Sequence, residues 1–155
     1  MAVEIERKFL VKNDNWKSCI SHSTSIRQGY LAPLSKSSVR IRIDGQSASI
    51  NIKSATLGIR RTEYEYPIPL KDAHEMLKNL CEEPQINKTR HHVHINQHTW
   101  EIDEFYDDNN GLIVAEIELR AEDEVFEKPE WLGEEVSDDP RYYNVNLIKH
   151  PYKKW

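Results

Sequence analysis

Acidic and basic side chains alternate with apolar ones along the first extended segment of the chain. Glu4, Glu6 and Lys8 lie two residues apart within the sequence Val-Glu-Ile-Glu-Arg-Lys-Phe-Leu-Val, residues 3–11. Residues i, i+2 and i+4 of a β-strand project from one face, so these three charges point the same way. Carboxylates are ligands for hard divalent cations, and an ammonium group suits phosphate oxygens. The segment therefore has the groups that a metal–phosphate complex needs.

The same spacing recurs on later segments, with apolar residues on the opposite face. The further bases are Arg40, Arg42, Lys53, Arg61, Lys88 and Arg90, and the further acids are Glu63, Glu65, Glu101, Asp103, Glu116 and Glu118. The pattern fits a charged sheet face exposed to water, or a lumen closed by mutual salt bridges. It also fits a lumen whose bases hold a polyanion while its acids hold divalent cations. Paired charges opposite apolar faces favour a charged interior.

The elements that must position these groups are about eight short strands and one crossover helix. The strands are expected at residues 3–11, 25–31, 39–43, 48–53, 59–68, 86–95, 100–105 and 112–119. Ala73, Met76, Leu77 and Leu80 fall at helical spacing, which predicts an amphipathic helix within residues 69–83.

The tail, residues 122–155, is predicted to be helical in two pieces, with Ser137 or Asp138 as a cap and Pro140 in the first turn. Eight antiparallel strands can close into a barrel with room for a small ligand. The predicted fold is therefore mainly β (α+β), an eight-stranded antiparallel β-tunnel. This closed barrel has a polar, charged lumen, flanking helices and a C-terminal helix. A chain of 155 residues is expected to form one domain, residues 1–155.

Composition excludes several other classes of protein. The formal net charge of −5 at pH 7 argues against a general nucleic-acid-binding protein. No apolar run approaches the ~20 residues of a membrane span, and no signal peptide is evident. Cys19 and Cys81 stand alone, without the spacing of a metal site, which is typical of a reducing cytoplasm. We therefore expect a cytoplasmic protein with no nucleic-acid or membrane partner.

The order of these motifs resembles that of the CYTH superfamily, the triphosphate tunnel metalloenzymes. Residues 4–8, Glu-Ile-Glu-Arg-Lys, match the family's ExExK signature. The later matching motifs, in order, are Gln28-Gly29-Tyr30-Leu31, Arg40-Ile41-Arg42, Lys53, Arg61-Thr62-Glu63-Tyr64-Glu65, Lys88-Thr89-Arg90, Glu101-Ile102-Asp103 and Glu116-Ile117-Glu118. The match runs from about Val3 to Leu119, and the tail is similar to that of compact bacterial members.

The resemblance implies a single CYTH domain that binds a small-molecule triphosphate together with two Mg²⁺ or Mn²⁺ ions. Phosphate contacts would come from Lys8, Arg40, Arg42, Lys53, Lys88 and Arg90, with Arg61 as an additional base. Metal ligands would be Glu4, Glu6, Glu63, Glu65, Asp103, Glu116 and Glu118. Lys8 and Tyr30 would be catalytic, since Tyr30 matches a tyrosine that some hydrolytic members pair with the ExExK lysine. Tyr30 would act as a base or as a group that orients water. The alternative is that it is an ordinary tyrosine lining the lumen.

Several chemistries share such a site. Inorganic triphosphatase, which splits tripolyphosphate into pyrophosphate and phosphate, is the leading hypothesis, because the short chain has no obvious extra loop for an organic group. Class IV adenylate cyclase and thiamine triphosphatase are alternative enzymes, and a non-catalytic polyphosphate- or nucleotide-binding module is an alternative of another class. The apolar outer faces of the strands need cover from helices or from a second subunit. A homodimer is therefore one of the two possibilities.

Four neighbouring histidines, His91, His92, His94 and His98, raise the question of zinc. Strand spacing places His92 and His94 on the same face as the bases at positions 88 and 90. An imidazole pair without a third ligand is a poor zinc site, and carboxylate-rich sites prefer Mg²⁺ or Mn²⁺. We therefore expect these histidines to lie near the phosphate or at the rim of the lumen.

Overall fold

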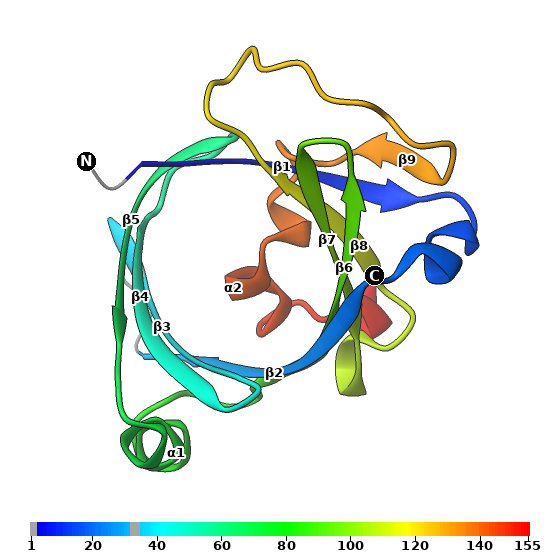
Figure 1. Cartoon of the computed structure of the whole chain (residues 1–155). Coiled ribbons are helices and arrows are strands. Elements are labelled where there is room, and N and C mark those ends of the chain that lie inside the picture. The colour runs from blue at the N-terminus through cyan, green and yellow to red at the C-terminus, as the bar shows by residue number, and fades with distance from the viewer. Residues whose placement is uncertain (1–2, 32–34) are drawn as a thin grey trace.

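A computed structural model describes residues 3–31 and 35–155 of the chain, which form a ring of antiparallel strands (Figure 1). The strands are β1 (Val3–Val11), β2 (His22–Tyr30), β3 (Ser37–Asp44), β4 (Ser47–Ser54), β5 (Arg60–Pro67), β6 (Ile86–Ile95), β7 (His98–Phe105), β8 (Ile113–Glu118) and β9 (Leu132–Glu135). The α-helices are α1 (Leu70–Asn79) and α2 (Asn144–Leu147), and short 3₁₀ turns span Asn15–Cys19, Asp107–Asn109, Pro140–Tyr142 and Tyr152–Lys154. No helix in this part of the chain is long and apolar enough to cross a membrane.

Strand β1 closes the barrel because its two halves pair with different partners. The strand order is β5-β4-β3-β2-β6-β7-β8-β1, and residues 3–5 of β1 return to pair with β5. Residues 6–10 of β1 pair with β8. This arrangement confirms the predicted eight-stranded antiparallel barrel, in which a closed sheet leaves no free edge.

A ninth strand, β9, pairs with the end of β1 where β5 no longer reaches it. Gly133 permits this approach, because a Cβ atom at this position would lie 2.9 Å from the backbone oxygen of Leu10. The chain comes closer here than any side chain allows, so the register of β9 depends on glycine.

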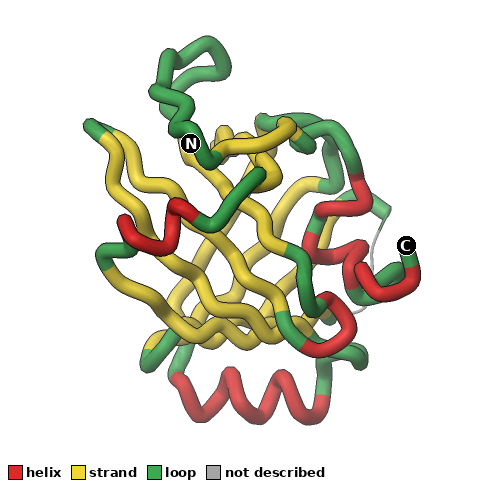
Figure 2. Tube along the Cα trace, turned by 90° about the vertical axis from the view of Figure 1, so that its right-hand side faces the viewer, coloured by secondary structure: helices red, strands yellow, loops and turns green. Residues whose placement is uncertain are grey.

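Apolar side chains cover the outside of the barrel wall in separate clusters. On one side Trp100, Ile102 and Ile117 face outward and pack against Trp16 and Trp131. On the other side α1 lies against β3 and β4, as Figure 2 shows below the barrel. There Ala73 and Leu77 of the helix bury Ile41 and Ile43. The sequence left open whether a helix or a second subunit covers such outer-face residues. For Ile41 and Ile43 the cover is a helix.

A third apolar cluster lies at one end of the barrel. Ile86, Phe105 and Val114 occur at the strand alternation of the lumen residues and pack against Tyr142 and Leu147 of the C-terminal segment. Figure 1 shows α2 inside the ring. The C-terminal segment thus contributes to the lumen and not only to the outer surface.

The prediction for the tail is confirmed for Pro140, which begins a 3₁₀ turn, and for a short C-terminal helix, α2, but it is wrong for the extent of the helices and for the cap. Residues 119–131 contain no helix, β9 follows, and the remaining helical pieces are at most four residues long. The capping residue is Asp139, whose side chain accepts a hydrogen bond from the backbone N–H of Arg141, and not Ser137 or Asp138. Prolines at 129, 140 and 151 interrupt any longer helix, because proline lacks the backbone donor.

Candidate active site

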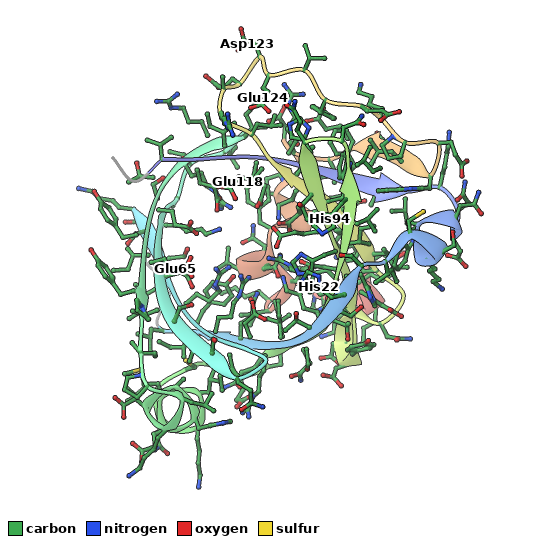
Figure 3. All side chains as sticks on the ribbon, in the orientation of Figure 1. His22, Glu65, His94, Glu118, Asp123 and Glu124 are labelled. Atoms are coloured by element: carbon green, nitrogen blue, oxygen red, sulfur yellow. The ribbon has the colours of Figure 1, made fainter. Side chains whose placement is uncertain are left out.

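A charged cavity of about 250 Å³ occupies the barrel lumen. It is lined by side chains from β1 to β8 and from the C-terminal segment, and Figure 3 shows Glu65 and Glu118 directed to the ring interior. The charged lining residues that the sequence predicted are Glu4, Glu6, Lys8, Arg40, Arg42, Lys53, Arg61, Glu63, Glu65, Lys88, Arg90, Glu101, Glu116 and Glu118, and Tyr30 lines the cavity as well. Strand alternation therefore brings together residues that lie more than a hundred positions apart in the sequence.

Glu4 is the centre of an ion-pair group on one side of the cavity. Its carboxylate lies 3.2 Å from Lys53 Nζ and 3.4 Å from Arg61, and Lys53 Nζ also lies 3.3 Å from Glu63. Burial raises the pKa of Glu4, but Lys53 and then Arg61 offset this, so that its pKa lies below the ordinary value. In this state Lys53 neutralises two of the acids that the sequence predicts as metal ligands.

Asp103 has a different setting from the other predicted metal ligands. It is fully buried behind the cavity lining, with one oxygen 2.7 Å from Lys88 Nζ and the two oxygens 2.8 and 2.9 Å from the guanidinium of Arg90. Burial raises the pKa of Asp103, but Arg90 and Lys88 more than offset it and lower the pKa to about 2. Since both oxygens are occupied, the carboxylate is placed to hold two bases at the lumen wall.

Glu6 and Glu116 crowd around the ammonium group of Lys8. Lys8 Nζ lies 2.9 Å from Glu116 and 3.8 Å from Glu6, and Glu116 also lies 3.6 Å from Arg90. Burial, and then the charge of Glu116, raise the pKa of Glu6 to about 8. Glu6 therefore holds a proton at neutral pH, as expected of a carboxyl group among like charges.

Replacing Glu6 by glutamine is expected to flatten part of the pH dependence of stability. The folded chain binds this proton up to pH about 8, whereas the unfolded chain releases it near the ordinary value of 4.5. The free energy of unfolding therefore falls as pH rises between these values, because the folded state binds more protons there. Thermal unfolding of both proteins in chelator at pH 5 and pH 8.5 would test this. The variant must gain stability relative to the parent at the higher pH, and an equal difference at both values contradicts the shift.

Arg40 and Arg42, unlike the crowded acids Glu6 and Glu116, have too few oppositely charged partners. Among the described residues neither forms an ion pair, and Arg40 Nε is buried without a hydrogen-bond partner. Burial, then the charges of Arg40 and Arg90, lower the pKa of Arg42 to about 10. Two neighbouring guanidinium groups without carboxylates are a site for an anion that the chain itself does not supply.

Two polar side chains that the sequence did not single out as site residues connect these bases across the lumen. Gln28 Oε1 accepts a hydrogen bond of 2.9 Å from Arg42 Nε, and its amide donates to Asn144 Oδ1 at 2.9 Å. Asn144 Oδ1 also accepts from Lys88 Nζ at 2.9 Å. Gln28 belongs to a motif of the resemblance, so it had a signal, whereas no motif or spacing singled out Asn144.

The predicted pairing of Lys8 with Tyr30 is not formed by a hydrogen bond in the described part of the chain. Lys8 Nζ is engaged by Glu116, and Tyr30 is a buried residue of β2 that lines the cavity opposite Arg40 in the β2–β3 register. The tyrosine is therefore within the site, near the bases that lack carboxylate partners.

The acids toward the opening fit a hard divalent cation by their chemistry. Partial burial, then Glu4, Glu101 and Glu63, raise the pKa of Glu118, which shows that negative charge is concentrated there. In residues 3–31 and 35–155 no three His, Cys, Asp or Glu side chains are already gathered closely enough to hold an ion. A polyanion that engaged the lysines would free their carboxylates for a metal, because each ion pair is then exchanged for another.

The CYTH domain family matches residues 2–152 of the chain. An inorganic triphosphatase of Acetivibrio thermocellus is 46% identical over 155 residues, which cover 100% of this chain and 99% of that protein. An inorganic triphosphatase of Nitrosomonas europaea is 36% identical over 148 residues, which cover 93% of this chain and 95% of that protein. The crystal structure of an inorganic triphosphatase gives a TM-score of 0.67 at 31% identity, covering 96% of this chain and 95% of that one.

Proposed function

Because the chain belongs to the CYTH domain family, we propose that it is an enzyme that hydrolyses inorganic tripolyphosphate to pyrophosphate and phosphate. The observation that carries this is the pair Arg40 and Arg42, which face a cavity rich in carboxylates without carboxylate partners of their own. A triphosphate with divalent cations would satisfy both sets of groups at once.

The bases bind and neutralise the substrate. Arg40 and Arg42 contact phosphate oxygens first, and Lys8, Lys53 and Arg61 share them as their ion pairs with the acids loosen. Lys88 and Arg90 contact the substrate while they stay bound to Asp103. Their fixed charges then offset the negative charge that shifts to the leaving group. We assign Asp103 to holding Lys88 and Arg90 in place, since neither of its oxygens is free.

Six acids remain to hold Mg²⁺ or Mn²⁺ in this proposal: Glu4, Glu6, Glu63, Glu65, Glu116 and Glu118. When bound, such ions neutralise phosphate oxygens and lower the pKa of an attacking water. Glu6, whose pKa is raised to about 8, would have to give up its proton to solvent to serve as a ligand. Tyr30 is placed to orient the water by its hydroxyl group, and its replacement by phenylalanine separates this role from simple packing.

Asn144 is expected to position the substrate-binding bases. Asn144→Ala removes the acceptor shared by Gln28 and Lys88, so KM should rise about tenfold while kcat changes less, since a hydrogen bond to a charged group is worth about 1.5–3 kcal/mol. Asn146→Ala is the matched control, because Asn146 lies in the same helix and bonds only to the backbone of Pro140. Equal kinetics of the two variants would contradict the role.

An organic triphosphate is the second candidate substrate, and one observation favours it. A mostly apolar cavity of about 250 Å³ adjoins the lumen and shares Tyr30, Arg61, Tyr143 and Val145 with it. An aromatic ring could lie there with its phosphates in the lumen. No motif in the sequence indicated such a pocket.

Phosphate release from tripolyphosphate, ATP, thiamine triphosphate and pyrophosphate, each with Mg²⁺, Mn²⁺ or chelator, tests the proposal. Metal-dependent turnover that favours tripolyphosphate supports it. Preference for thiamine triphosphate, or cyclic AMP formed from ATP, assigns the organic substrate instead. Tight triphosphate binding without any turnover would make the chain a binding module.

We place the enzyme in the cytoplasm. Cys19 and Cys81 are both free, and Cys19 is exposed, which suits a reducing compartment.

A further inference from the structure

Three histidines gather at the edge of the lumen, although only two of them are close in the sequence. His22 of β2 lies opposite His92 of β6 in the strand register, with ring centres 4.0 Å apart and the planes at 10°. The ring of His94 lies 6.5 Å from that of His22. Figure 3 shows His22 and His94 on the same side of the ring interior.

The other histidines of the 91–98 segment are engaged elsewhere. His91 bonds to Ser23 and Glu104 beside Trp16, on the alternate face of β6. His98 bonds to Glu124. Neither His91 nor His98 therefore joins His92 and His94. The third imidazole, which the sequence pattern lacked, comes from His22.

Two rings of this histidine group have a side-chain partner at Nδ1, as metal-binding imidazoles commonly do. His22 Nδ1 lies 3.2 Å from Ser21 Oγ, and His94 Nδ1 lies 2.9 Å from Thr99 Oγ1. Where the hydroxyl oxygen accepts from Nδ1–H, Nε2 is the nitrogen that can bind a metal. The ring of His92 has no hydrogen-bond partner among the described residues. Burial, then His22 and Arg90, lower its pKa, so the ring is neutral at neutral pH, which is the form that binds metals.

We propose that His22, His92 and His94 form a binding site for a transition-metal ion such as Zn²⁺, separate from the carboxylates that would hold Mg²⁺ or Mn²⁺. Imidazole nitrogen selects Zn²⁺, Ni²⁺ and Cu²⁺ over the harder cations. Two imidazoles on one tetrahedral zinc have ring centres about 5 Å apart, which lies between the two separations found here. The rings do not yet point to one centre, so side-chain rotation must complete the site. Because His22 and His94 are exposed, that rotation is open to them.

The position of this site links it to the lumen. His92 lines a cavity of about 710 Å³ together with Glu101 and Glu118, and both of these acids also line the lumen. A metal ion on the three imidazoles would stand at this approach to the charged cavity. Zn²⁺ is therefore expected to inhibit any reaction in the lumen by occupying its edge, without displacing Mg²⁺.

Direct zinc binding to the whole chain tests the site independently of any hydrolysis. Zn²⁺ is titrated calorimetrically in excess Mg²⁺, which saturates the carboxylates, and histidine side-chain NMR identifies the nitrogens that shift. One Zn²⁺ per chain is expected, with the signals of His22, His92 and His94 moving among the seven histidines. Shifts spread over other histidines, or no binding, overturn the proposal.

Variants give the second test. His92→Ala should weaken zinc binding well over tenfold, because loss of an outer hydrogen-bond partner alone is worth about 10–100-fold. Thr99→Val removes such a partner from His94 and should fall near the lower end of that range. His74→Ala on the exposed surface of α1 is the matched control and should bind as the parent does. Equal affinity in His92→Ala and His74→Ala means that the histidine group is not the site.

Discussion

Replacing Glu118 by glutamine is expected to lower tripolyphosphate turnover about a hundredfold or more, with the melting temperature changed by no more than about 2 °C. The side chain lies exposed at the opening of the lumen, and no described base forms an ion pair with it. The substitution therefore keeps the shape and removes a carboxylate that the chain uses for no internal contact. Loss of a metal ligand should also raise the Mg²⁺ concentration that gives half-maximal rate.

The same carboxylate-to-amide change elsewhere on the barrel is the control for Glu118→Gln. Glu134 of β9 is exposed and lies outside the cavity lining, so Glu134→Gln should leave rate and Mg²⁺ dependence unchanged. The measurement is initial phosphate release over a range of Mg²⁺ concentrations. If Glu118→Gln retains the parent rate at every concentration, Glu118 is not a metal ligand.

Replacing Arg40 by methionine is expected to raise KM for tripolyphosphate about 10–150-fold, which corresponds to the roughly 1.5–3 kcal/mol of a charge-assisted contact. The free protein should become more stable at the same time. Arg40 is buried with an unpartnered Nε, and removing an uncompensated buried charge favours the folded state by about 1 kcal/mol or more. Weaker substrate binding together with higher stability is the result expected of a base whose role is to bind a ligand.

Arg27→Met provides the comparison for Arg40→Met. Arg27 lies on the outer face of β2, where its guanidinium donates to Gln85, so its loss should leave KM unchanged. Steady-state kinetics and thermal unfolding without substrate measure both quantities. An unchanged KM in Arg40→Met, or a loss of stability larger than that of Arg27→Met, contradicts the assignment.

Local alternation was enough to predict the barrel and most of its charged lining. Residues 3–11 already separate charges from apolar side chains, and the later strands repeat the pattern. A period of two residues fixes which face a side chain occupies, whatever the strand's partners are. For this reason the predicted bases and acids all line the cavity except Asp103. Asp103 lies behind Lys88 and Arg90, to which its carboxylate is bonded.

What the sequence did not predict depends on contacts between distant segments. His22 joins His92 only because β2 pairs with β6, a register that no local pattern specifies. Asn144 enters the lumen from the C-terminal segment, where a single amide has no distinguishing spacing. β9, with the sequence Leu-Gly-Glu-Glu, is too short to alternate and is set by the close approach at Gly133.

The way β1 is shared among its partners also bears on how the protein is made. Strand β1 pairs with β5, β8 and β9, so its neighbours are synthesised long after it. Leu147, which is fully buried, completes the apolar cluster at the barrel end only after all of the described strands have been synthesised. Pairing across such sequence separations folds slowly, and a nascent β1 exposes both edges meanwhile. A partly synthesised chain therefore cannot close the barrel. The charged inner faces of its strands help to keep the unfinished sheet in solution.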